Sequence, residues 1–381
     1  MKKVLIVSHV SGFVPQFEMS NVKILQEMEY EVHYATNYNI PQYGNDNIRL
    51  EKSGILQQQV DFSRSPFRII QNLKAFLQLK TLIKHENYAM IHCHTPIGGV
   101  LTRIALKNNK KAKVIYTAHG FHFYKGAPIM NWIIYYLIER YLARFTDVLI
   151  TINEEDYKNA SKFKLKPGGR VVKINGVGIE VNKFNNIYKN RINNINKILS
   201  KDIVFLSVGE LNRNKNHRLV IEALYKIKRK NFVYVICGEG TQKKNLLKMI
   251  KSYQLQDQVY LLGYRRDMEK ILLYADVFIM PSFREGLSVA LQEAMASGLP
   301  VIATDIRGNN ELIDDDLGGS LTPNNDINAM AKKLLYLYKV NRQSMGIYNI
   351  NKIKKYDKKT VSAAMRIIYQ NVLEEDMCWK N

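Results

Sequence analysis

Short apolar runs alternate with amphipathic segments along most of the chain. The runs are rich in β-branched residues, which is typical of strands buried on both faces. In the first half they lie at 3–9, 31–36, 90–95, 113–120, 147–152 and 171–177. In the second half they lie at 203–208, 232–237, 259–262, 277–280 and 301–304. Because helical patterns separate most of these runs, we expect two consecutive α/β units, each a doubly wound parallel sheet covered on both faces.

An Asn-rich stretch at 181–196 interrupts the alternation. A chain of 381 residues is also too long for one ordinary core. We therefore predict an N-terminal domain at 1–180, a second domain at 181–357, and a C-terminal helix at 358–381 that packs back on the first domain. Ligands of doubly wound sheets bind at the carboxyl ends of the strands, so two facing domains of this kind would make a cleft between them.

Two helical segments of the first half are unusually rich in apolar residues. The segment 129–145 is strongly apolar and aromatic, so we expect a largely buried helix. The segment 66–84 has apolar residues at helical spacing and cations at other positions, among them Arg68, Lys74 and Lys80. It is either an ordinary surface helix packed on its sheet or an interfacial helix attracted to anionic lipid, and the two interpretations are compatible.

The chain is strongly basic, with a formal net charge of +22 that is spread over both halves. Nucleic acid, an anionic membrane surface and a phosphorylated substrate are each compatible with this excess. The sequence contains no zinc-finger spacing, RNP-like aromatic motif or basic zipper, which argues against nucleic acid. It contains no apolar run long enough for a transmembrane helix. The three cysteines are scattered, which is typical of buried thiols in a reducing cytoplasm.

The segment from Pro281 to Pro300 carries the main functional signal. It follows an apolar strand, contains Glu285-Gly286, and continues with helical spacing to a Gly-Leu-Pro end. A helix N-terminus of this kind offers free N–H groups to a phosphate. Glu293 lies about two helical turns beyond Glu285, too far for paired acid/base work on one bond. Without other context, one capping and one solvent-exposed glutamate would be an equally good interpretation.

This segment resembles the nucleotide-sugar signature of the retaining GT-B glycosyltransferases of family GT4, the E-x7-E group. The positions that match its pattern are Glu285, Gly286, Glu293, Ala294, Ala296, Gly298, Pro300 and Val301. The resemblance implies that Glu285 contacts the donor sugar, that Gly286 and Leu287 offer backbone N–H groups to the phosphates, and that Glu293 binds the ribose hydroxyls. A carboxylate suits this last role because it can accept from two vicinal hydroxyls.

A second motif, 207–217, joins a strand end to a helix and is either a polar loop or a diphosphate clamp. In the clamp, Arg213 and Lys215 face the anion. Lys215 matches a lysine of the GT4 pattern, whereas Glu210 stands where the family usually has an arginine. Arg213 is the candidate replacement for that arginine.

A third motif, at 117–126, places His119 next to a glycine at a strand's carboxyl end. The resemblance implies that His119 reaches the donor sugar across the cleft, and His94 could line the acceptor side. A metal site is not expected, because no carboxylate cluster or cysteine pair accompanies the histidines. Two glycine signals complete the donor site: Gly238 would line the donor, and the turn with Gly263 and Arg265 would border the base.

The resemblance as a whole implies the GT-B fold and transfer of a sugar from a nucleotide diphosphate, with UDP expected, to a glycan hydroxyl with retention. No cofactor or metal is expected, because cationic groups stabilise the departing diphosphate. The run 117–126 most resembles bacterial enzymes that build exopolysaccharide or capsule repeats on a polyprenyl diphosphate. We therefore expect a cytoplasmic protein held peripherally at the inner face of the plasma membrane.

Three alternatives remain open at this point. A nucleotide-sugar epimerase or a phosphorylase could use the same scaffold, since fold does not settle function. An epimerase would be expected to carry extra acid/base carboxylates, and a phosphorylase would consume free phosphate. The third alternative is a non-catalytic binder that uses the basic surface, and it would release no UDP from any UDP-sugar.

Overall fold

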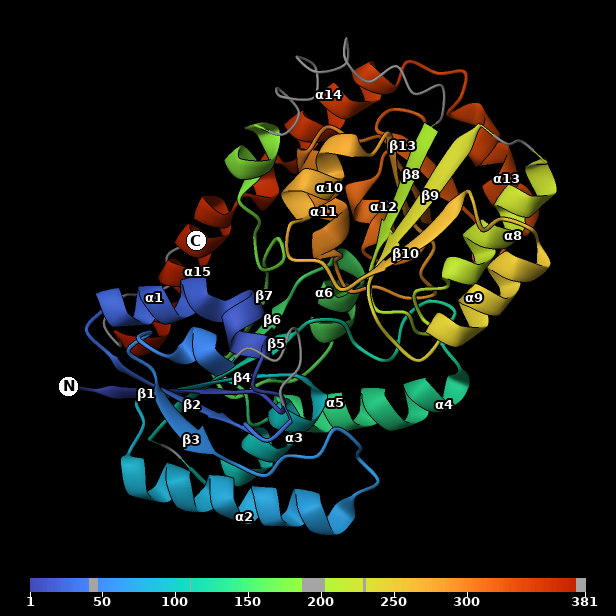
Figure 1. Cartoon of the computed structure of the whole chain (residues 1–381). Helices are drawn as coiled ribbons and strands as arrows, with labels where there is room; N and C mark the ends of the chain where they lie inside the picture. The colour runs from blue at the N-terminus through green and yellow to red at the C-terminus, as the bar shows by residue number, and fades with distance from the viewer. Residues whose placement is uncertain (41–46, 110, 187–202, 229–230, 375–381) are drawn as a thin grey trace. The chain divides into compact units, whose positions relative to one another are not determined.

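The computed structural model describes residues 1–40, 47–109, 111–186, 203–228 and 231–374. The chain divides into two compact units. Unit 1 combines Met1–Val177 with Lys358–Asn381, and unit 2 is Gly178–Asp357 (Figure 1). Most of the Asn-rich stretch expected at the junction, from 187 to 196, lies outside the described residues.

Unit 1 contains a seven-stranded sheet in the order β3-β2-β1-β4-β5-β6-β7, and every pairing is parallel. Its strands are β1 (Lys3–Val7), β2 (Glu31–Thr36), β3 (Leu56–Gln59), β4 (Met90–His94), β5 (Lys113–Ala118), β6 (Val148–Thr151) and β7 (Arg170–Lys173). The edge strand β3 was not predicted, because its sequence Leu-Gln-Gln-Gln is polar and largely exposed. The strand order reverses between β1 and β4, which is where doubly wound sheets bind ligands.

Unit 2 contains a six-stranded parallel sheet in the order β10-β9-β8-β11-β12-β13. Its strands are β8 (Ile203–Val208), β9 (Phe232–Cys237), β10 (Val259–Gly263), β11 (Val277–Met280), β12 (Val301–Thr304) and β13 (Gly319–Thr322). Here the order reverses between β8 and β11. The predicted fold class, two doubly wound parallel-sheet domains, is confirmed.

Helices fill the connections between the strands. In unit 1 they are η1 (Val14–Glu18), α1 (Met19–Glu27), η2 (Asn47–Leu50), α2 (Ile69–Glu86), α3 (Pro96–Ala105), α4 (Ile129–Asn131), η3 (Trp132–Tyr136), α5 (Leu137–Ala143), α6 (Glu154–Ala160) and α15 (Lys358–Leu373). In unit 2 they are α8 (His217–Ile227), α9 (Lys243–Ser252), α10 (Met268–Tyr274), α11 (Val289–Ala296), α12 (Asn309–Leu312), α13 (Ile327–Tyr336), α14 (Arg342–Ile353) and η5 (Lys354–Tyr356).

The C-terminal helix α15 belongs to unit 1 and contacts α1. Its Tyr369 is fully buried, and the hydroxyl lies 2.9 Å from Nδ1 of His92 on β4. Nε2 of the same histidine lies 2.8 Å from Oγ1 of Thr117 on β5. His92 is therefore a satisfied core histidine that ties α15 to two central strands.

The prediction that 129–145 forms a largely buried helix is wrong. The helical run α4–η3–α5 buries Leu142 and Ala143, and Trp132 packs partly against the core. Seven other large apolar side chains of the run are exposed: Ile129, Met130, Ile133, Ile134, Leu137, Ile138 and Tyr141. One face of the run is enough to cover the sheet, so the apolar residues on its other face point to solvent.

Among the helices within the described ranges, none combines the length and the apolar character that crossing a membrane requires.

Candidate functional site

Three strand-end glycines line the carboxyl edge of the unit 2 sheet. Gly209 follows β8 and donates its N–H to Cys237 O at 2.9 Å, while Gly238 follows β9 and donates to Gly263 O, at the end of β10, at 2.8 Å. A Cβ on Gly238 would lie 1.9 Å from Gly209 O, so no side chain fits there. Gly238 was predicted to line the donor, and close backbone packing leaves no room for a side chain there. Gly263, predicted to border the base, lies against the Glu239 side chain, because a Cβ on Gly263 would lie 2.7 Å from Glu239 Oε1.

Lys215 and Glu285 meet beside this edge. Lys215 Nζ lies 2.7 Å from Glu285 Oε1, and both side chains are mostly buried. The stem of Lys215 runs along Gly209, where a Cβ would lie 2.9 Å from Lys215 Cε. The loop after β8 and the loop after β11 are therefore joined by an ion pair between two predicted site residues.

Backbone hydrogen bonds hold these two loops together. Phe283 donates its N–H to Asn214 O at 2.8 Å, and Asn214 Nδ2 donates to Arg284 O at 3.0 Å. Arg307, after β12, is buried and donates Nε–H to Glu285 O at 3.2 Å. Arg307 was not predicted as a site residue, and only the adjacent Gly308 turn was visible in the sequence.

The helix of the E-x7-E segment begins later than expected. α11 starts at Val289, and its N-cap is Ser288, whose side chain accepts from Leu291 N at 3.3 Å. The expectation that the helix N-terminus lies at Gly286 is therefore wrong: Gly286 and Leu287 belong to the preceding turn. The turn is tightly packed, because a Cβ on Gly308 would lie 2.2 Å from Gly286 O.

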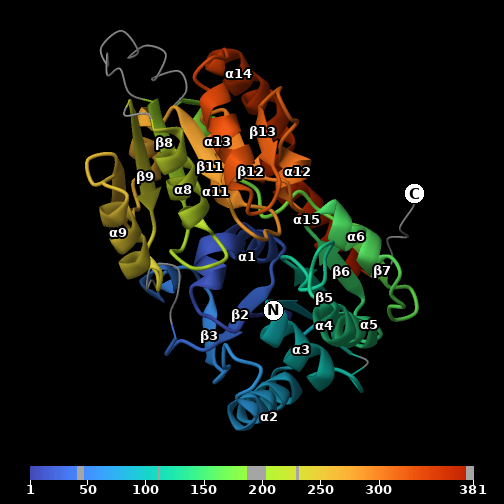
Figure 2. The ribbon, with the colours of Figure 1, turned by 90° about the vertical axis from the view of Figure 1, so that its right-hand side faces the viewer.

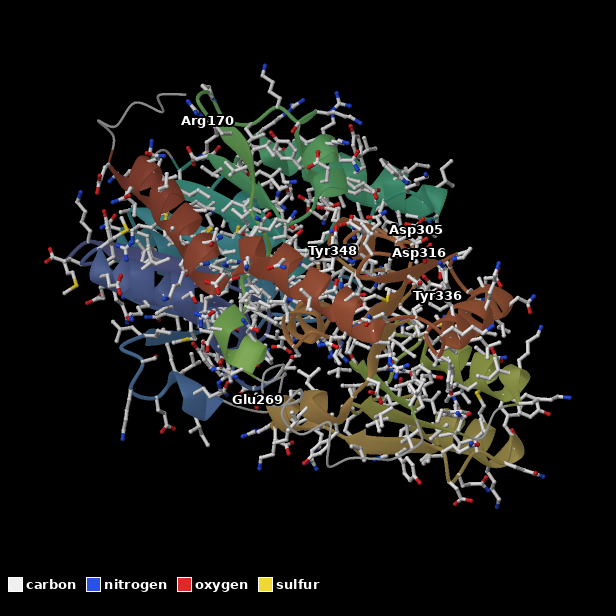
Figure 3. All side chains as sticks on the ribbon, turned by 90° about the horizontal axis from the view of Figure 1, so that it is seen from above. Arg170, Glu269, Asp305, Asp316, Tyr336 and Tyr348 are labelled. Atoms are coloured by element: carbon white, nitrogen blue, oxygen red, sulfur yellow. The ribbon has the colours of Figure 1, made fainter. Side chains whose placement is uncertain are left out.

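Glu293 lies in the body of α11 and is partly buried. Burial raises the pKa of its carboxyl to about 7, and the positive charge of Lys183 opposes this rise. Lys183 is in turn ion-paired with Glu269, which projects from α10 (Figure 3). Glu293 can therefore change between its neutral and charged forms near neutral pH.

The other predicted cations are arranged differently. Arg213 is exposed, as is Glu210 at the position where GT4 enzymes usually have an arginine. Arg265 is engaged by Asp267 through two contacts, Nε–Oδ1 at 2.9 Å and Nη2–Oδ2 at 2.7 Å. In unit 2, Lys215 is thus paired with Glu285, and Arg265 is paired with the neighbouring Asp267. Arg213 lies at the surface.

Unit 1 holds a second cluster, formed by Glu18, His94 and His119. His94 Nδ1 lies 3.2 Å from His119 Nε2, and Glu18 Oε1 lies 3.6 Å from the first nitrogen and 3.7 Å from the second. The ring of Phe13 packs against both imidazoles. Glu18 and His94 are buried, whereas the side chain of His119 is 23% exposed.

Burial keeps this cluster uncharged near neutral pH. It raises the pKa of the Glu18 carboxyl to about 8 and lowers the pKa of His119 to about 4. The pKa of His94 is well below its usual value for the same reason. Glu18 and His119 line a small pocket together with residues of α15, among them Ser362. The cluster can therefore exchange hydrogen bonds and protons with a group that enters this pocket.

The same three side chains could hold a divalent cation. Ligand atoms about 2.0–2.1 Å from a tetrahedral zinc ion lie about 3.3–3.4 Å apart, close to the spacing of Glu18, His94 and His119. No metal was predicted because no carboxylate cluster or cysteine pair accompanies the histidines in the sequence. The fold adds one carboxylate, since η1 brings Glu18 to them from a distant part of the sequence. Against a metal, the outer nitrogen of His94, Nε2, is buried and has no hydrogen-bond partner among the described residues to orient the ring.

Two family models match the chain. The model described as "Glycosyl transferase 4-like" matches residues 3–153, and the model "Glycosyl transferases group 1" matches residues 189–353. A Bacillus subtilis protein named "Putative glycosyltransferase EpsD" is 38% identical over 344 residues, which cover 88% of this chain and 87% of that protein. A UDP-Gal:α-D-GlcNAc-diphosphoundecaprenol α-1,3-galactosyltransferase of Escherichia coli is 30% identical, covering 89% and 92% respectively.

Solved structures show the same fold. Sucrose-phosphate synthase from Thermosynechococcus elongatus aligns with a TM-score of 0.78 at 16% identity, over 99% of this chain and 100% of that one. HepE from Anabaena, in complex with UDP, aligns with a TM-score of 0.74 at 17% identity, over 97% and 100%. The GT-B fold predicted from the sequence is thereby confirmed, and the chain belongs to the GT4-like bacterial glycosyltransferases.

Proposed function

We propose that this enzyme transfers a sugar from a UDP-sugar to a hydroxyl of a lipid-linked glycan, with retention, in exopolysaccharide or capsule synthesis at the cytoplasmic face of the membrane. The diphosphoundecaprenol galactosyltransferase of Escherichia coli supports the acceptor class. A Campylobacter jejuni relative, 38% identical over 36% of this chain and 38% of that protein, has a name that also includes a diphospho-undecaprenol acceptor. UDP-bound and UDP-glucose-bound HepE support the donor.

The observation that carries the proposal is the Lys215–Glu285 pair beside the strand-end glycines of β8, β9 and β10. A diphosphate needs a cation, which Lys215 supplies, and the glycines add no side chains of their own at the strand ends. The adjacent Glu285 is then placed to accept from sugar hydroxyls. This arrangement of opposite charges suits a ligand that is anionic at one end and rich in hydroxyls at the other.

The remaining predicted residues take the following parts in this proposal. Gly286 and Leu287 donate backbone N–H groups to the phosphates, and Glu293 accepts from the ribose hydroxyls. Gly238 lines the donor, while Gly263 and Arg265 border the base. Arg213 adds positive charge from the surface and so assists Lys215.

For the chemical step, we propose attack of the acceptor hydroxyl on the face from which UDP departs. The new C–O bond forms as the bond to the diphosphate oxygen breaks, and that oxygen takes the acceptor proton. Lys215 then stabilises the negative charge that develops on the diphosphate, which is a general role of preorganised cations. His119 contacts the donor sugar. No cofactor or metal is part of the proposal.

The test is a donor screen with the full chain, using a panel of UDP-sugars and a polyprenyl-diphosphate-linked sugar as acceptor. We expect UDP release and a lipid-linked product one sugar heavier by mass spectrometry. UDP release that requires free phosphate would indicate a phosphorylase, and conversion of the UDP-sugar without UDP release an epimerase. No turnover with any nucleotide sugar would overturn the proposal in favour of a binding protein.

A further inference from the structure

Exposed apolar side chains are concentrated on two helical segments of unit 1. Among the described residues, 25 large apolar side chains are exposed, and 12 of them lie within 67–77 and 129–141. On α4–η3–α5 they recur at helical spacing, with Ile129 75%, Ile133 50% and Leu137 54% exposed. A stripe of this size is unusual for a surface that faces only water.

Helix α2 has two apolar faces. Ala75, Leu79 and Ile83 are buried against the sheet. At 100° per residue, a second set of apolar residues falls on the opposite side of the helix and is more than half exposed: Ile70, Leu73 and Leu77. Phe67 and Ile69, at the start of the helix, extend this outer face. Packing within unit 1 accounts for only one of the two faces.

Both outer faces point away from the same side of the unit 1 sheet. Buried residues of α2 and of α5, such as Leu79 and Ala143, belong to one core cluster with strand residues such as Cys93 and Leu149. Helix α3 lies between α2 and α5 and contacts both (Figures 1 and 2). Ile104 on α3 is also exposed. We call the outer sides of α2, α3 and α4–η3–α5 the outer helix surface.

The charges on this surface are almost all positive. Exposed cations on or next to α2 and α5 are Arg64, Arg68, Lys74, Lys80, Lys84, Lys125, Arg140 and Arg144. The sequence contains no Asp or Glu between Phe62 and His85. Between Gly120 and Thr146 the only acidic residue is Glu139, which is buried and ion-paired with Arg103 at 2.9 Å. At 100° per residue, Lys80 and Lys74 lie on the two sides of the apolar stripe of α2, and Lys84 continues its line. Lys74 is ion-paired with the partly buried Asp61 at 2.8 Å.

We propose that the outer helix surface docks on a bilayer containing anionic phospholipids, with the apolar stripes in the interface and the cations at the headgroups. Large aliphatic side chains bordered by Lys and Arg, without exposed carboxylates, fit that partner. A second copy of the chain fits less well, because its own outer helix surface would bring the same positive charge. The proposal rests on the proposed function for its membrane location and deepens it by naming the docking surface and the lipid charge. Vesicle binding measures it without turnover.

The test is co-sedimentation of the full chain with phosphatidylcholine vesicles, with and without phosphatidylglycerol. We expect binding that requires the anionic lipid and weakens with salt. Ile133→Ser/Leu137→Ser and Ile70→Ser/Leu73→Ser should each lower the partition coefficient by about tenfold or more. The matched control is Leu247→Ser/Ile347→Ser, which removes equally exposed aliphatic side chains from unit 2 and should bind as the wild type does.

A charge variant keeps the test decisive if an apolar variant misfolds. Lys80→Glu/Lys84→Glu changes only exposed side chains and should also lose binding to anionic vesicles. Wild-type binding by all folded variants, or no vesicle binding by the wild type, would overturn the proposal. So would a wild-type dimer that Ile133→Ser/Leu137→Ser dissociates, because the surface would then be an interface between copies. Turnover on a water-soluble short-chain acceptor should survive in every variant, which separates loss of docking from loss of the proposed activity.

Discussion

Lys215 Nζ lies 2.7 Å from Glu285 Oε1, so the two residues with the strongest claim on the donor bind each other in unit 2. The side chains are only 19% and 13% exposed, and their charges compensate in a partly desolvated place. A diphosphate that binds Lys215 must therefore either share the lysine with Glu285 or displace the glutamate from it. In the proposed donor site, the pair would orient both groups before the donor binds, and Glu285 would become available to sugar hydroxyls once Lys215 turned to the phosphate.

The first prediction concerns the two members of this pair. Lys215→Ala removes the phosphate ligand and leaves a mostly buried carboxylate, so UDP affinity should fall by about ten- to a hundredfold. Glu285→Gln frees Lys215, so UDP should bind at least as tightly as to the wild type while sugar transfer falls by about a hundredfold or more. Calorimetry with UDP and steady-state rates would measure both effects.

Lys248→Ala is the control for this pair, because it removes an exposed lysine from α9. This variant should change neither the UDP affinity nor the rate of sugar transfer. Unchanged UDP affinity in Lys215→Ala would show that the diphosphate binds elsewhere.

The second prediction is a pH dependence that comes from Glu293. Its carboxyl has a pKa raised to about 7 by burial, and a ribose that donates hydrogen bonds favours the charged form. Donor binding should therefore release a proton, and UDP-sugar affinity should rise as the pH increases through about 7. The diphosphate of the UDP-sugar does not titrate near pH 7, so the change of affinity with pH reports on a group of the protein.

Glu293→Gln separates this effect from others, because it keeps the shape and removes the titration. Its UDP-sugar affinity should be lower than the wild-type value at pH 8 and nearly flat with pH. A slope that persists in Glu293→Gln would assign the titration to another group.

The third prediction concerns the cluster of Glu18, His94 and His119. We expect turnover to survive dialysis against a chelator, because the carboxyl of Glu18 stays protonated near neutral pH and the ring of His94 lacks an outer hydrogen-bond partner. Glu18→Gln should retain most of the activity under the same conditions. Loss of activity on chelation, restored by zinc in the wild type but not in Glu18→Gln, would show instead that the cluster is a metal site.

The fourth prediction concerns the attachment of α15. Tyr369→Phe removes the hydroxyl that lies 2.9 Å from His92 Nδ1 and leaves a buried nitrogen without a partner. The free energy of unfolding should fall by about 1–3 kcal/mol. Tyr225→Phe, at a half-exposed position, is the matched control and should be neutral. Equal stability of both variants in denaturant titrations would show that the His92–Tyr369 contact does not hold α15 in place.

The sequence predicted most of the fold because buried parallel strands have a clear apolar pattern. It missed β3, whose Leu56–Gln59 residues are mostly polar at a sheet edge, and β13, whose Gly-Ser-Leu-Thr carries little apolar signal. The burial of 129–145 was predicted wrongly, because apolar periodicity cannot tell a face that meets the sheet from one that lies outside it. Whether an apolar helix face is buried depends on how much of the sheet the other helices leave uncovered.

The candidate site was predictable only where its residues form a local motif. Lys215 and Glu285 each belong to a strand-end motif, but their contact depends on the β8–β11 pairing. Glu18 carries no motif and reaches the histidines only through the fold, and Arg307 acts by holding the backbone of Glu285. The start of α11 at Val289 depends on the Ser288 cap. The sequence did not locate this start, because the apolar spacing around Leu287 is also compatible with a helix.

Retention of the donor's anomeric configuration defines the proposed reaction, and the configuration of the product measures it. Once the donor screen has identified an α-linked UDP-sugar that is consumed, proton NMR of the newly formed linkage would determine that configuration. We predict an α-linked product on a lipid-linked acceptor, and its formation should fall sharply in Glu285→Gln. A β-linked product would exclude retaining transfer, and full product formation by Glu285→Gln would exclude the proposed role of Glu285.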